Sequence, residues 1–548
     1  MSSILSLTGL LALSGITLSH ATPSTPTVTI ANGTILGSTS GAVESFLGIP
    51  YAQPPTGSLR FRAPVSLNSS FGTFNATGTP PACPQLTQGN VPGFALLPED
   101  ILGLYTAHSY AATDVSEDCS TEENPWSGLL SESISLDHPV IIVSINYRVS
   151  AFGFLGGSQI QNDHVGGSNT NNGLRDQRLA LKWVAENIAA FGGDPDRVTI
   201  WGESAGAVSV LYHMLFEGGD NTYKGKPLFH AAIMNSGSSF PAHDVDSDAA
   251  QAQAVFDSIA EAGGCNVTGT GAENPLECLR NLPFDELLNA TNVVPALFTN
   301  TSNALSFIPR PDPTDSFFSQ SPEVAVREGK LARVPIMTGN QQDEGALFAI
   351  SMEDGNTTSR FIDGPLSDLY TTTPRSILSK LVGTYSTNPA AGAPFNSGDT
   401  GVIYPEYKRN AAVIGDAFFI LQRRYQLEHT VDLMPIWTFS AAYNQTWVPL
   451  GTAHGSDLAM FGTGYPVVAY AHISQYYISF VNYLNPNGIG GGKGCKNNAS
   501  DSLTFWPQWT LGGREMIQFD VDGEKIIKDD FREGSYEYFK TIVSSMRI

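Results

Sequence analysis

The chain has 548 residues, of which 41% are hydrophobic and 15% charged, and its formal net charge is −23. This composition indicates a globular protein with a large core and excludes an intrinsically disordered chain. The negative charge argues against nucleic acid or an anionic membrane surface as a partner. The length allows several average domains, but α/β enzymes often run this long as one unit with insertions.

The N-terminal end resembles a secretory signal peptide. Residues 4–18 form an apolar run that is too short to span a bilayer, and Ser19-His20-Ala21 supplies small residues for cleavage. We therefore expect residues 1–21 to be a signal peptide, residues 22–548 to be a single catalytic domain, and the protein to be secreted. Nine Asn-x-Ser/Thr sequons are typical of an exported protein that is N-glycosylated. They lie at Asn32, Asn68, Asn75, Asn266, Asn289, Asn300, Asn356, Asn444 and Asn498.

Five cysteines in an exported chain suggest two disulfides and one cysteine left over. Cys265 and Cys278 enclose a short Gly/Asn/Thr loop and are natural partners. Cys83 and Cys119 would close a longer loop, which leaves Cys495 as the odd one. The residues alone leave this pairing open.

The N-terminal third contains a predicted hairpin and a predicted lid. Residues 27–47 alternate apolar and small polar side chains around Asn32-Gly33, which favours a β-hairpin. Residues 84–118 contain a short amphipathic segment whose apolar side chains recur at helical spacing. These are Phe94, Leu96, Leu97, Ile101 and Leu104. The segment is either a surface helix or a lid over an apolar site.

The middle of the chain alternates predicted strands and helices. Residues 139–146 form a continuous apolar run of the kind seen in buried parallel strands, and residues 175–191 follow with helical periodicity. A strand over residues 198–201 comes next and leads into another helix. Later strands are expected at residues 231–234, 334–337 and 434–439. This order predicts an α/β fold with a mostly parallel, doubly wound central sheet and helices on both faces.

The most informative stretch is Gly202-Glu203-Ser204-Ala205-Gly206, which follows the strand at residues 198–201. Gly-x-Ser-x-Gly between a strand and a helix is the nucleophile elbow, in which a strained turn presents the serine hydroxyl above the sheet. The glycines suit a turn that is too tight for side chains on either flank. Ser204 is therefore the candidate nucleophile, and the Ala205 N–H at the start of the helix is a candidate oxyanion donor.

Two later strand ends supply partners for this serine. Glu344 follows the strand at residues 334–337, and His454 follows the strand at residues 434–439. Loops at the carboxyl ends of parallel strands are where α/β proteins build their sites. A serine needs an imidazole to accept its proton, and the imidazole needs a carboxylate to hold its tautomer. Ser204, Glu344 and His454 stand in the chain order of α/β-hydrolase triads.

With these residues in place, the chain resembles the type-B carboxylesterase/lipase family, and within it the secreted fungal lipases and sterol esterases. The resemblance rests on segments in the family's order along nearly the whole chain. They are residues 48–55, Leu59-Arg60-Phe61, Glu117-Asp118-Cys119, Asn146-Tyr147-Arg148, residues 191–195, residues 202–206, Asp343-Glu344-Gly345, residues 453–457 and residues 529–532.

The resemblance implies an α/β-hydrolase fold, a Ser-Glu-His triad and the disulfides Cys83–Cys119 and Cys265–Cys278. It also favours a lid inside the first disulfide loop. The expected activity is a secreted carboxylic-ester hydrolase that forms an acyl-enzyme on Ser204 and uses no cofactor and no metal. The expected partner is a small-molecule or lipid ester, with transient contact to a lipid interface.

One departure from the family pattern is large. In the family, Glu-Asp-Cys is followed by a strand, then by a second apolar strand that ends in a Gly-Gly-Gly loop with further oxyanion donors. Here Cys119 is followed by Ser120-Thr121-Glu122, and the next apolar strand is already the one at residues 139–146. Roughly 30 residues are missing relative to the pattern that carries the elbow and its oxyanion loop.

A skipped exon in the gene model, a true splice variant and a degenerate paralogue each account for this gap. The alternative function is accordingly a non-catalytic or strongly impaired esterase-like protein, such as an adhesion or binding protein on the same fold. Such relatives usually lose a triad member, whereas this chain keeps all three. A serine peptidase of this fold is disfavoured, since nothing in the chain suggests an added propeller domain.

Overall fold

The computed structural model describes residues 25–86, 115–118, 126–246, 251–265, 274–295, 305–443, 448–461, 468–489 and 503–548. The predicted signal peptide lies outside these residues, as does most of the predicted lid, residues 87–114. Four of the sequons also lie outside them, at Asn266, Asn300, Asn444 and Asn498. Cys119 and Cys495 do so too, so the Cys83–Cys119 disulfide stays a prediction.

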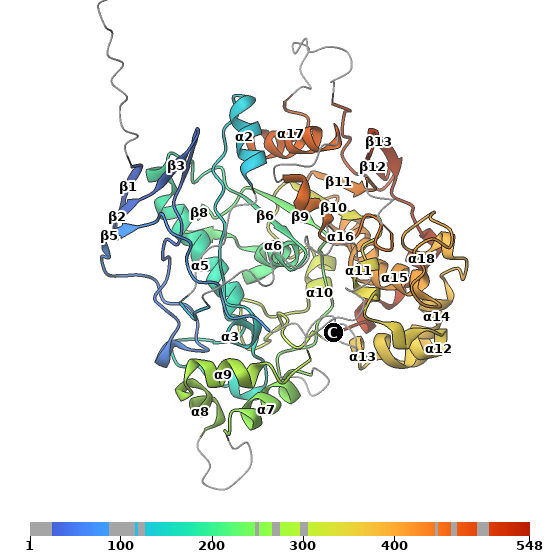
Figure 1. Ribbon diagram of the computed structural model, residues 1–548, viewed down its shortest axis with the longest axis horizontal. Coiled ribbons are helices and arrows are strands. Elements are labelled where there is room, and N and C mark those ends of the chain that lie inside the picture. Colours follow the sequence, from blue (N-terminus) through green and yellow to red (C-terminus); the bar gives the residue numbers. More distant parts are fainter. Residues whose placement is uncertain are drawn as a thin grey trace, which may run out of the picture.

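A six-stranded sheet forms the centre of the molecule, in the order β13-β12-β11-β10-β9-β6 (Figure 1). The strands from β6 to β12 are parallel, and β13 is antiparallel to β12. Their bounds are β6 Thr199–Glu203, β9 Ala231–Asn235, β10 Ile336–Gln341, β11 Ile436–Ala441, β12 Glu515–Asp520 and β13 Gly523–Lys528. The mostly parallel sheet expected from the sequence is confirmed.

Alternating side chains of this sheet pack into two separate cores. Ile200, Met234 and Ile336 lie on one face and contact the apolar side of α6 (Ala205–Leu215) and Leu427 of α16 (Leu421–Thr430). Ile233, Met337 and Trp437 lie on the other face with α2 (Ser127–Ser135) and α17 (Val468–Tyr483). Strands that are buried on both faces need apolar residues at every position, which explains the continuous apolar runs in the sequence.

The remaining elements surround this sheet. The predicted N-terminal hairpin is confirmed by the antiparallel pairing of β1 (Thr27–Ile30) with β2 (Gly33–Leu36). The other strands are β3 Ser38–Ser40, β4 Val43–Ser45, β5 Gly72–Asn75, β7 Thr222–Tyr223 and β8 Lys226–Pro227. The other helices are α3 Ser150–Phe154, α4 Ser158–Gln161, α5 Asn172–Asn187, α7 Ala252–Ala262, α8 Pro275–Asn281, α9 Phe284–Thr291, α10 Pro322–Arg327, α11 Ala346–Ala349, α12 Thr358–Phe361, α13 Ser367–Leu369, α14 Arg375–Gly383, α15 Tyr407–Gly415 and α18 Glu533–Ile542. Within the described ranges, no helix combines the length and the apolar character that crossing a membrane requires.

Residues 139–146 do not form the strand that their apolar run predicts. They form irregular backbone between α2 and α3, and they pair with no strand in the part of the chain that the structure describes. A β-strand is stable only when its backbone groups pair with a neighbour, so an apolar sequence alone is not sufficient. Strand β6, which the family pattern would place inside the sheet, is instead the edge strand at this side (Figure 1).

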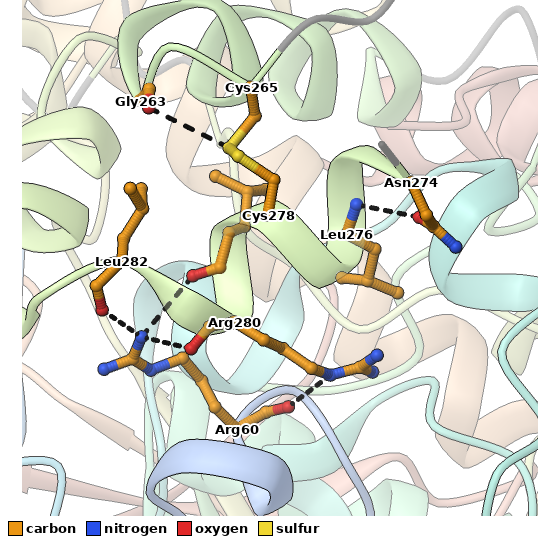
Figure 2. The surroundings of a disulfide bond; sticks show 9 residues. Arg60, Gly263, Cys265, Asn274, Leu276, Cys278, Arg280 and Leu282 are labelled. Atoms are coloured by element: carbon orange, nitrogen blue, oxygen red, sulfur yellow. Dashed lines mark hydrogen bonds between the residues drawn. A yellow bond between two sulfur atoms is a disulfide. The ribbon is translucent and has the colours of Figure 1, made fainter. Parts of the chain in front are cut away.

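The disulfide Cys265–Cys278 is present and links the end of α7 to α8 (Figure 2). Next to it, the Arg60 guanidinium donates to the carbonyl oxygens of Arg280 and Leu282, at 2.8 and 2.6 Å. Arg60 also forms a buried ion pair with Glu117, at 2.6 Å. Arg60 and Glu117, which belong to two of the segments that resemble the family, therefore have a structural role, because they fix the end of α8.

A second buried charge cluster supports the sheet from α16. The Asp529 carboxylate is fully buried and accepts hydrogen bonds from Arg423 and Arg424. Burial raises the pKa of Asp529, but the two guanidinium groups outweigh it and lower the pKa to about 2. Arg423 also donates to Asn340 Oδ1 at 2.7 Å, so this cluster reaches the carboxyl end of β10.

We expect Asp529→Asn to lower the free energy of unfolding by about 3–5 kcal/mol, because it leaves the buried Arg423 guanidinium without its counter-charge and Arg424 with only the partly exposed Glu533. Urea denaturation measures this loss at neutral pH. Asp530→Asn is the matched control, since the neighbouring Asp530 side chain is exposed. The pKa of Asp529 is lowered by folding, so its contribution is present above the unfolded pKa and is lost as the pH falls through about 2. Equal stability of both variants would contradict this assignment.

Candidate active site

Ser204 lies at the sharp junction between β6 and α6. Its backbone has φ 56° and ψ −121°, a conformation that is unfavourable for a residue with a side chain. Its N–H donates to the Asn235 carbonyl at 2.9 Å, so the end of β9 holds the turn in place. The strand and helix predicted on either side of the elbow are both confirmed, with α6 starting at Ala205.

The two glycines of the elbow are needed for different reasons. A Cβ at Gly202 would lie 2.2 Å from the Gly206 carbonyl carbon, so no side chain fits there. A Cβ at Gly206 would meet nothing within 4 Å. The expectation that the turn excludes side chains on both flanks is thus wrong for Gly206, whose backbone is what approaches Gly202. Gly237, which the sequence analysis did not single out, is equally constrained, since its Cβ would lie 2.6 Å from the Ser204 carbonyl oxygen.

Ser204, His454 and Glu344 form one continuous hydrogen-bonded chain. His454 Nε2 lies 2.6 Å from Ser204 Oγ, and His454 Nδ1 lies 2.7 Å from Glu344 Oε2. The ionised carboxylate can only accept, so Nδ1 carries the proton and Nε2 is left to accept from the serine hydroxyl. Residues separated by 250 positions in the sequence thus meet in the arrangement that activates a serine.

The two loops that carry Glu344 and His454 are tied to each other. Glu344 Oε1 accepts from the Gln341 N–H at 2.8 Å, which fixes the carboxylate at the end of β10. Buried Asp343 accepts from the Thr452 N–H at 3.0 Å, and the Asp343 N–H donates to the Thr452 carbonyl at 3.0 Å. This reciprocal pair holds the histidine loop against the glutamate loop, and sequence reasoning missed this role of Asp343.

The comparison with protein families agrees with this geometry. The model of the carboxylesterase family matches residues 24–121 and 126–539, which is nearly the whole chain. The chain belongs to the carboxylesterase family. It is a carboxylic-ester hydrolase of the type-B carboxylesterase/lipase group. The family match is interrupted at residues 122–125, the place where the sequence analysis finds a segment missing.

Curated relatives within this carboxylesterase family include secreted fungal lipases. Secreted triacylglycerol lipase LIP1 of Gibberella zeae is 40% identical and covers 93% of this chain and 89% of its own length. Secreted lipase 1 of Botryotinia fuckeliana is 38% identical, with 95% and 94% covered. The alignment with LIP1 runs over 548 positions but spans 93% of this 548-residue chain, so LIP1 has residues that this chain lacks.

A solved structure supports the fold of this carboxylesterase. The crystal structure of Aspergillus niger EstA superposes with a TM-score of 0.74, covers 96% of this chain and 99% of its own, and is 24% identical. This likeness concerns the fold alone. It confirms the α/β-hydrolase architecture expected from the order of the strands.

Two further carboxylates lie beside the histidine of this carboxylesterase. Glu203 Oε1 is 3.5 Å from His454 Nε2, and Asp457 accepts from the Asn235 side chain at 2.7 Å. Burial raises the pKa of Glu203 to about 8 and that of Asp457 to about 6. Burial lowers the pKa of His454, but the carboxylates of Glu203 and Glu344 outweigh it and raise the pKa above its ordinary value of 6.5. Sequence reasoning missed both acids, although each is one to three residues from a triad member.

The raised pKa of His454 predicts that the acid-side limb of the kcat/KM pH profile lies at a higher pH than an ordinary histidine would give. Only neutral His454 can accept the serine proton, so activity should rise as the pH passes the raised pKa of His454. Glu203→Gln removes a charge that favours the imidazolium, so the limb should move to lower pH by about one unit. Initial rates with a soluble aryl ester between pH 5 and 10 measure this limb. This range of about five pH units covers the titration of His454 on both sides of its pKa.

The control for this experiment is Glu261→Gln, since Glu261 is an exposed acid on α7, away from the site. It should leave the profile unchanged. An unchanged profile in Glu203→Gln as well would mean that the Glu203 charge does not reach His454.

Aromatic rings border the histidine on its apolar side. The ring centroids of Phe419 and Phe348 lie 4.5 and 5.1 Å from that of His454. Phe240 extends this wall by packing against Phe418 and Phe419. The site is therefore apolar on this side and exposed at Ala205, where α6 begins.

One candidate oxyanion donor lies at the nucleophile elbow. The Ala205 N–H belongs to the first turn of α6, where backbone donors have no acceptor within the helix. Gly156 and Gly157 lie against Ala252 and Gln253 of α7 instead of Ser204. In the part of the chain that the structure describes, no group of three or more His, Cys, Asp or Glu side chains is arranged to hold a metal ion.

Proposed function

We propose that this protein is a secreted serine carboxylesterase or lipase, with Ser204 as nucleophile, His454 as general base and acid, and Glu344 as the carboxylate that orients the imidazole. The observation that carries the proposal is the unbroken chain Ser204–His454–Glu344, with contacts of 2.6 and 2.7 Å. The Ala205 N–H at the N-terminus of α6 is proposed as one oxyanion donor.

In the proposed acylation step, Ser204 Oγ attacks the ester carbonyl carbon while His454 Nε2 takes the hydroxyl proton. The negative charge that develops on the carbonyl oxygen is stabilised by the Ala205 N–H. The tetrahedral intermediate then expels the alcohol, which receives the proton from His454. Glu344 stabilises the imidazolium throughout, without taking its proton.

Deacylation repeats these steps with water as the nucleophile. His454 Nε2 takes a proton from water, whose oxygen attacks the acyl carbon, and Ser204 Oγ then leaves with that proton. The carboxylic acid is released and the free serine is restored. No redox partner or cofactor is needed for this balance.

The proposed substrate is a lipid ester or a small-molecule ester with an apolar acyl chain. Support comes from the names of the relatives, among them a secreted triacylglycerol lipase. The rings of Phe348, Phe419 and Phe240 offer apolar surface beside the reacting atoms, which suits an acyl chain. Contact with a lipid interface through the lid over residues 84–118 remains part of this proposal.

Secretion is proposed on the signal-like residues 1–21 and on the names of the secreted relatives. Asn68, Asn75 and Asn289 are exposed, as glycan acceptors must be. Asn32 and Asn356 are half-buried. N-glycosylation at the sequons is therefore proposed together with export.

Covalent labelling with a fluorophosphonate tests the proposed nucleophile. The wild-type chain should be labelled at Ser204, as identified by peptide mass spectrometry, and labelling should require neutral His454. Labelling at another serine, or none in a folded sample, would favour the non-catalytic alternative.

A further inference from the structure

A cleft of about 580 Å³ separates residues 139–145 from strand β6. All of residues 139–145 line one side, and residues 198–203 line the other. Trp126, Leu129 and Tyr477 contribute apolar side chains to its wall. The cleft therefore lies beside the edge of the sheet, and at Gly202, Glu203 and Gly206 it ends at the nucleophile elbow.

The β6 side of the cleft is a strand edge that pairs with no further strand among the described residues. β6 pairs with β9 on one side, and the bond from the Ser204 N–H to the Asn235 carbonyl shows which residues face that strand. Backbone groups alternate in direction along a strand, so Thr199, Trp201 and Glu203 direct their N–H and C=O groups toward the cleft. These are the groups that a further parallel strand would use.

The opposite side is also without a backbone partner. Among the described residues, residues 139–145 make no backbone hydrogen bond, although they include four aliphatic residues in succession, Val140 to Val143. Ile141 and Val143 are 46% and 42% exposed. An extended apolar segment with unpaired backbone facing an unpaired strand is energetically unfavourable unless another strand fills the space.

We propose that this cleft is a binding site for one extended peptide strand, which inserts between β6 and residues 139–145 and pairs with both. The occupant is an uncharged segment with apolar side chains, supplied from outside this chain and lying parallel to β6. Its main-chain groups provide the affinity, and the apolar walls on both faces of the sheet select its side chains.

The choice of this occupant rests on three observations. Both walls of the cleft offer backbone donors and acceptors, so a peptide satisfies more of them than a lipid chain could. Isoleucine and valine dominate the residues 139–145, and no charged side chain lies between Arg197 and Glu203 on the β6 wall. The family match breaks at residues 122–125, just before Trp126 on the wall of the cleft, and LIP1 carries residues that this chain lacks.

The test uses a synthetic peptide with the residues that LIP1 of Gibberella zeae carries between its counterparts of residues 121 and 126, added to the full chain. Trp126 and Trp201 line the cleft with ring centroids 4.6 Å apart, so binding should give a saturable change in tryptophan fluorescence. Amide hydrogen exchange of residues 139–145 and 198–203 should slow by at least about tenfold, because both edges gain hydrogen bonds. Exchange that slows elsewhere, or nowhere, overturns the proposal.

Two controls separate strand insertion from general apolar binding. The same peptide with N-methyl groups on alternate residues loses the donors on one side and should bind at least about tenfold more weakly. Thr199→Pro removes one N–H from the cleft edge while leaving the face toward β9 intact, and edge strands tolerate proline at such positions. It should weaken binding of the unmodified peptide by a similar factor. Equal binding of the methylated peptide overturns the proposal whether or not Thr199→Pro folds.

A second copy of the chain is the other occupant that the experiment distinguishes. Light scattering of the protein alone reports its oligomeric state over a range of concentrations. Dimers that protect residues 198–203 from exchange and exclude the peptide would show that a second copy of the chain occupies the cleft. That result would overturn the proposed occupant.

Discussion

Ser204→Ala is expected to reduce kcat for ester hydrolysis by about 10⁴–10⁶-fold, because it removes the hydroxyl that lies 2.6 Å from His454 Nε2 and is proposed to attack the ester. His454→Ala should cause a similar loss. Glu344→Gln should cost less, about 10³–10⁴-fold, because the amide can still orient the ring but no longer stabilises the imidazolium. Steady-state hydrolysis of a soluble aryl ester measures all three.

The effects of these three substitutions should not add. Since the residues act as one unit, Ser204→Ala combined with His454→Ala should be no slower than either variant alone within about tenfold. Ser209→Ala is the matched control, because the Ser209 hydroxyl lies about one helical turn further along α6 and donates to the Ala205 carbonyl at 2.8 Å. Substantial activity in Ser204→Ala would refute the assignment, and multiplicative losses would refute the shared mechanism.

Much of this site could be predicted from the sequence, because its main residues follow from local pattern and chain order. Strands at residues 198–201, 334–337 and 434–439 correspond to β6, β10 and β11. Parallel strands bring their carboxyl ends to one edge of the sheet, so residues just beyond them converge. That single rule places Ser204, Glu344 and His454 together.

The supporting residues could not be predicted in this way. Asp343 holds Thr452, and Asn235 holds Asp457, across separations of 109 and 222 residues. Such pairs depend on how two loops approach each other, which no local pattern encodes. The charge that Glu203 places 3.5 Å from His454 also depends on the fold of the elbow and not on its spacing.

The wrong strand prediction at residues 139–146 has a different cause. Apolar periodicity reports burial on two faces, but a strand also needs neighbours in the plane of the sheet. The run is present, but no strand in the described part of the chain pairs with it. The hairpin of β12 and β13 was not predicted, because its strands mix apolar and polar residues without a clear pattern. These strands are defined mainly by pairing with each other and, for β12, with β11.

Inserting the segment that the family pattern places after Cys119 should have the second large effect, an increase in the rate of ester hydrolysis. We expect this chain to hydrolyse aryl esters at least about a hundredfold more slowly than a version with the LIP1 segment inserted between residues 121 and 126. The reason is that the proposed oxyanion site has one donor, the Ala205 N–H, and each lost donor typically costs about 10²–10³ in rate. The inserted segment should also occupy the cleft of about 580 Å³ and convert β6 from an edge strand into an interior strand.

The restored version should also be more stable. Each buried backbone group without a partner costs about 1–3 kcal/mol, against a total stability of about 5–15 kcal/mol, so a few such groups remove most of the margin. Ile141 and Val143, exposed here, should become buried, and aggregation of the expressed protein should fall.

Soluble yield, urea denaturation and aryl-ester turnover of the two chains, expressed side by side, measure these differences. A restored chain that carries Ser204→Ala keeps the stability comparison independent of activity. Equal turnover of the two active chains would mean that other residues complete the oxyanion site, and equal stability would mean that residues 139–145 and β6 need no strand between them.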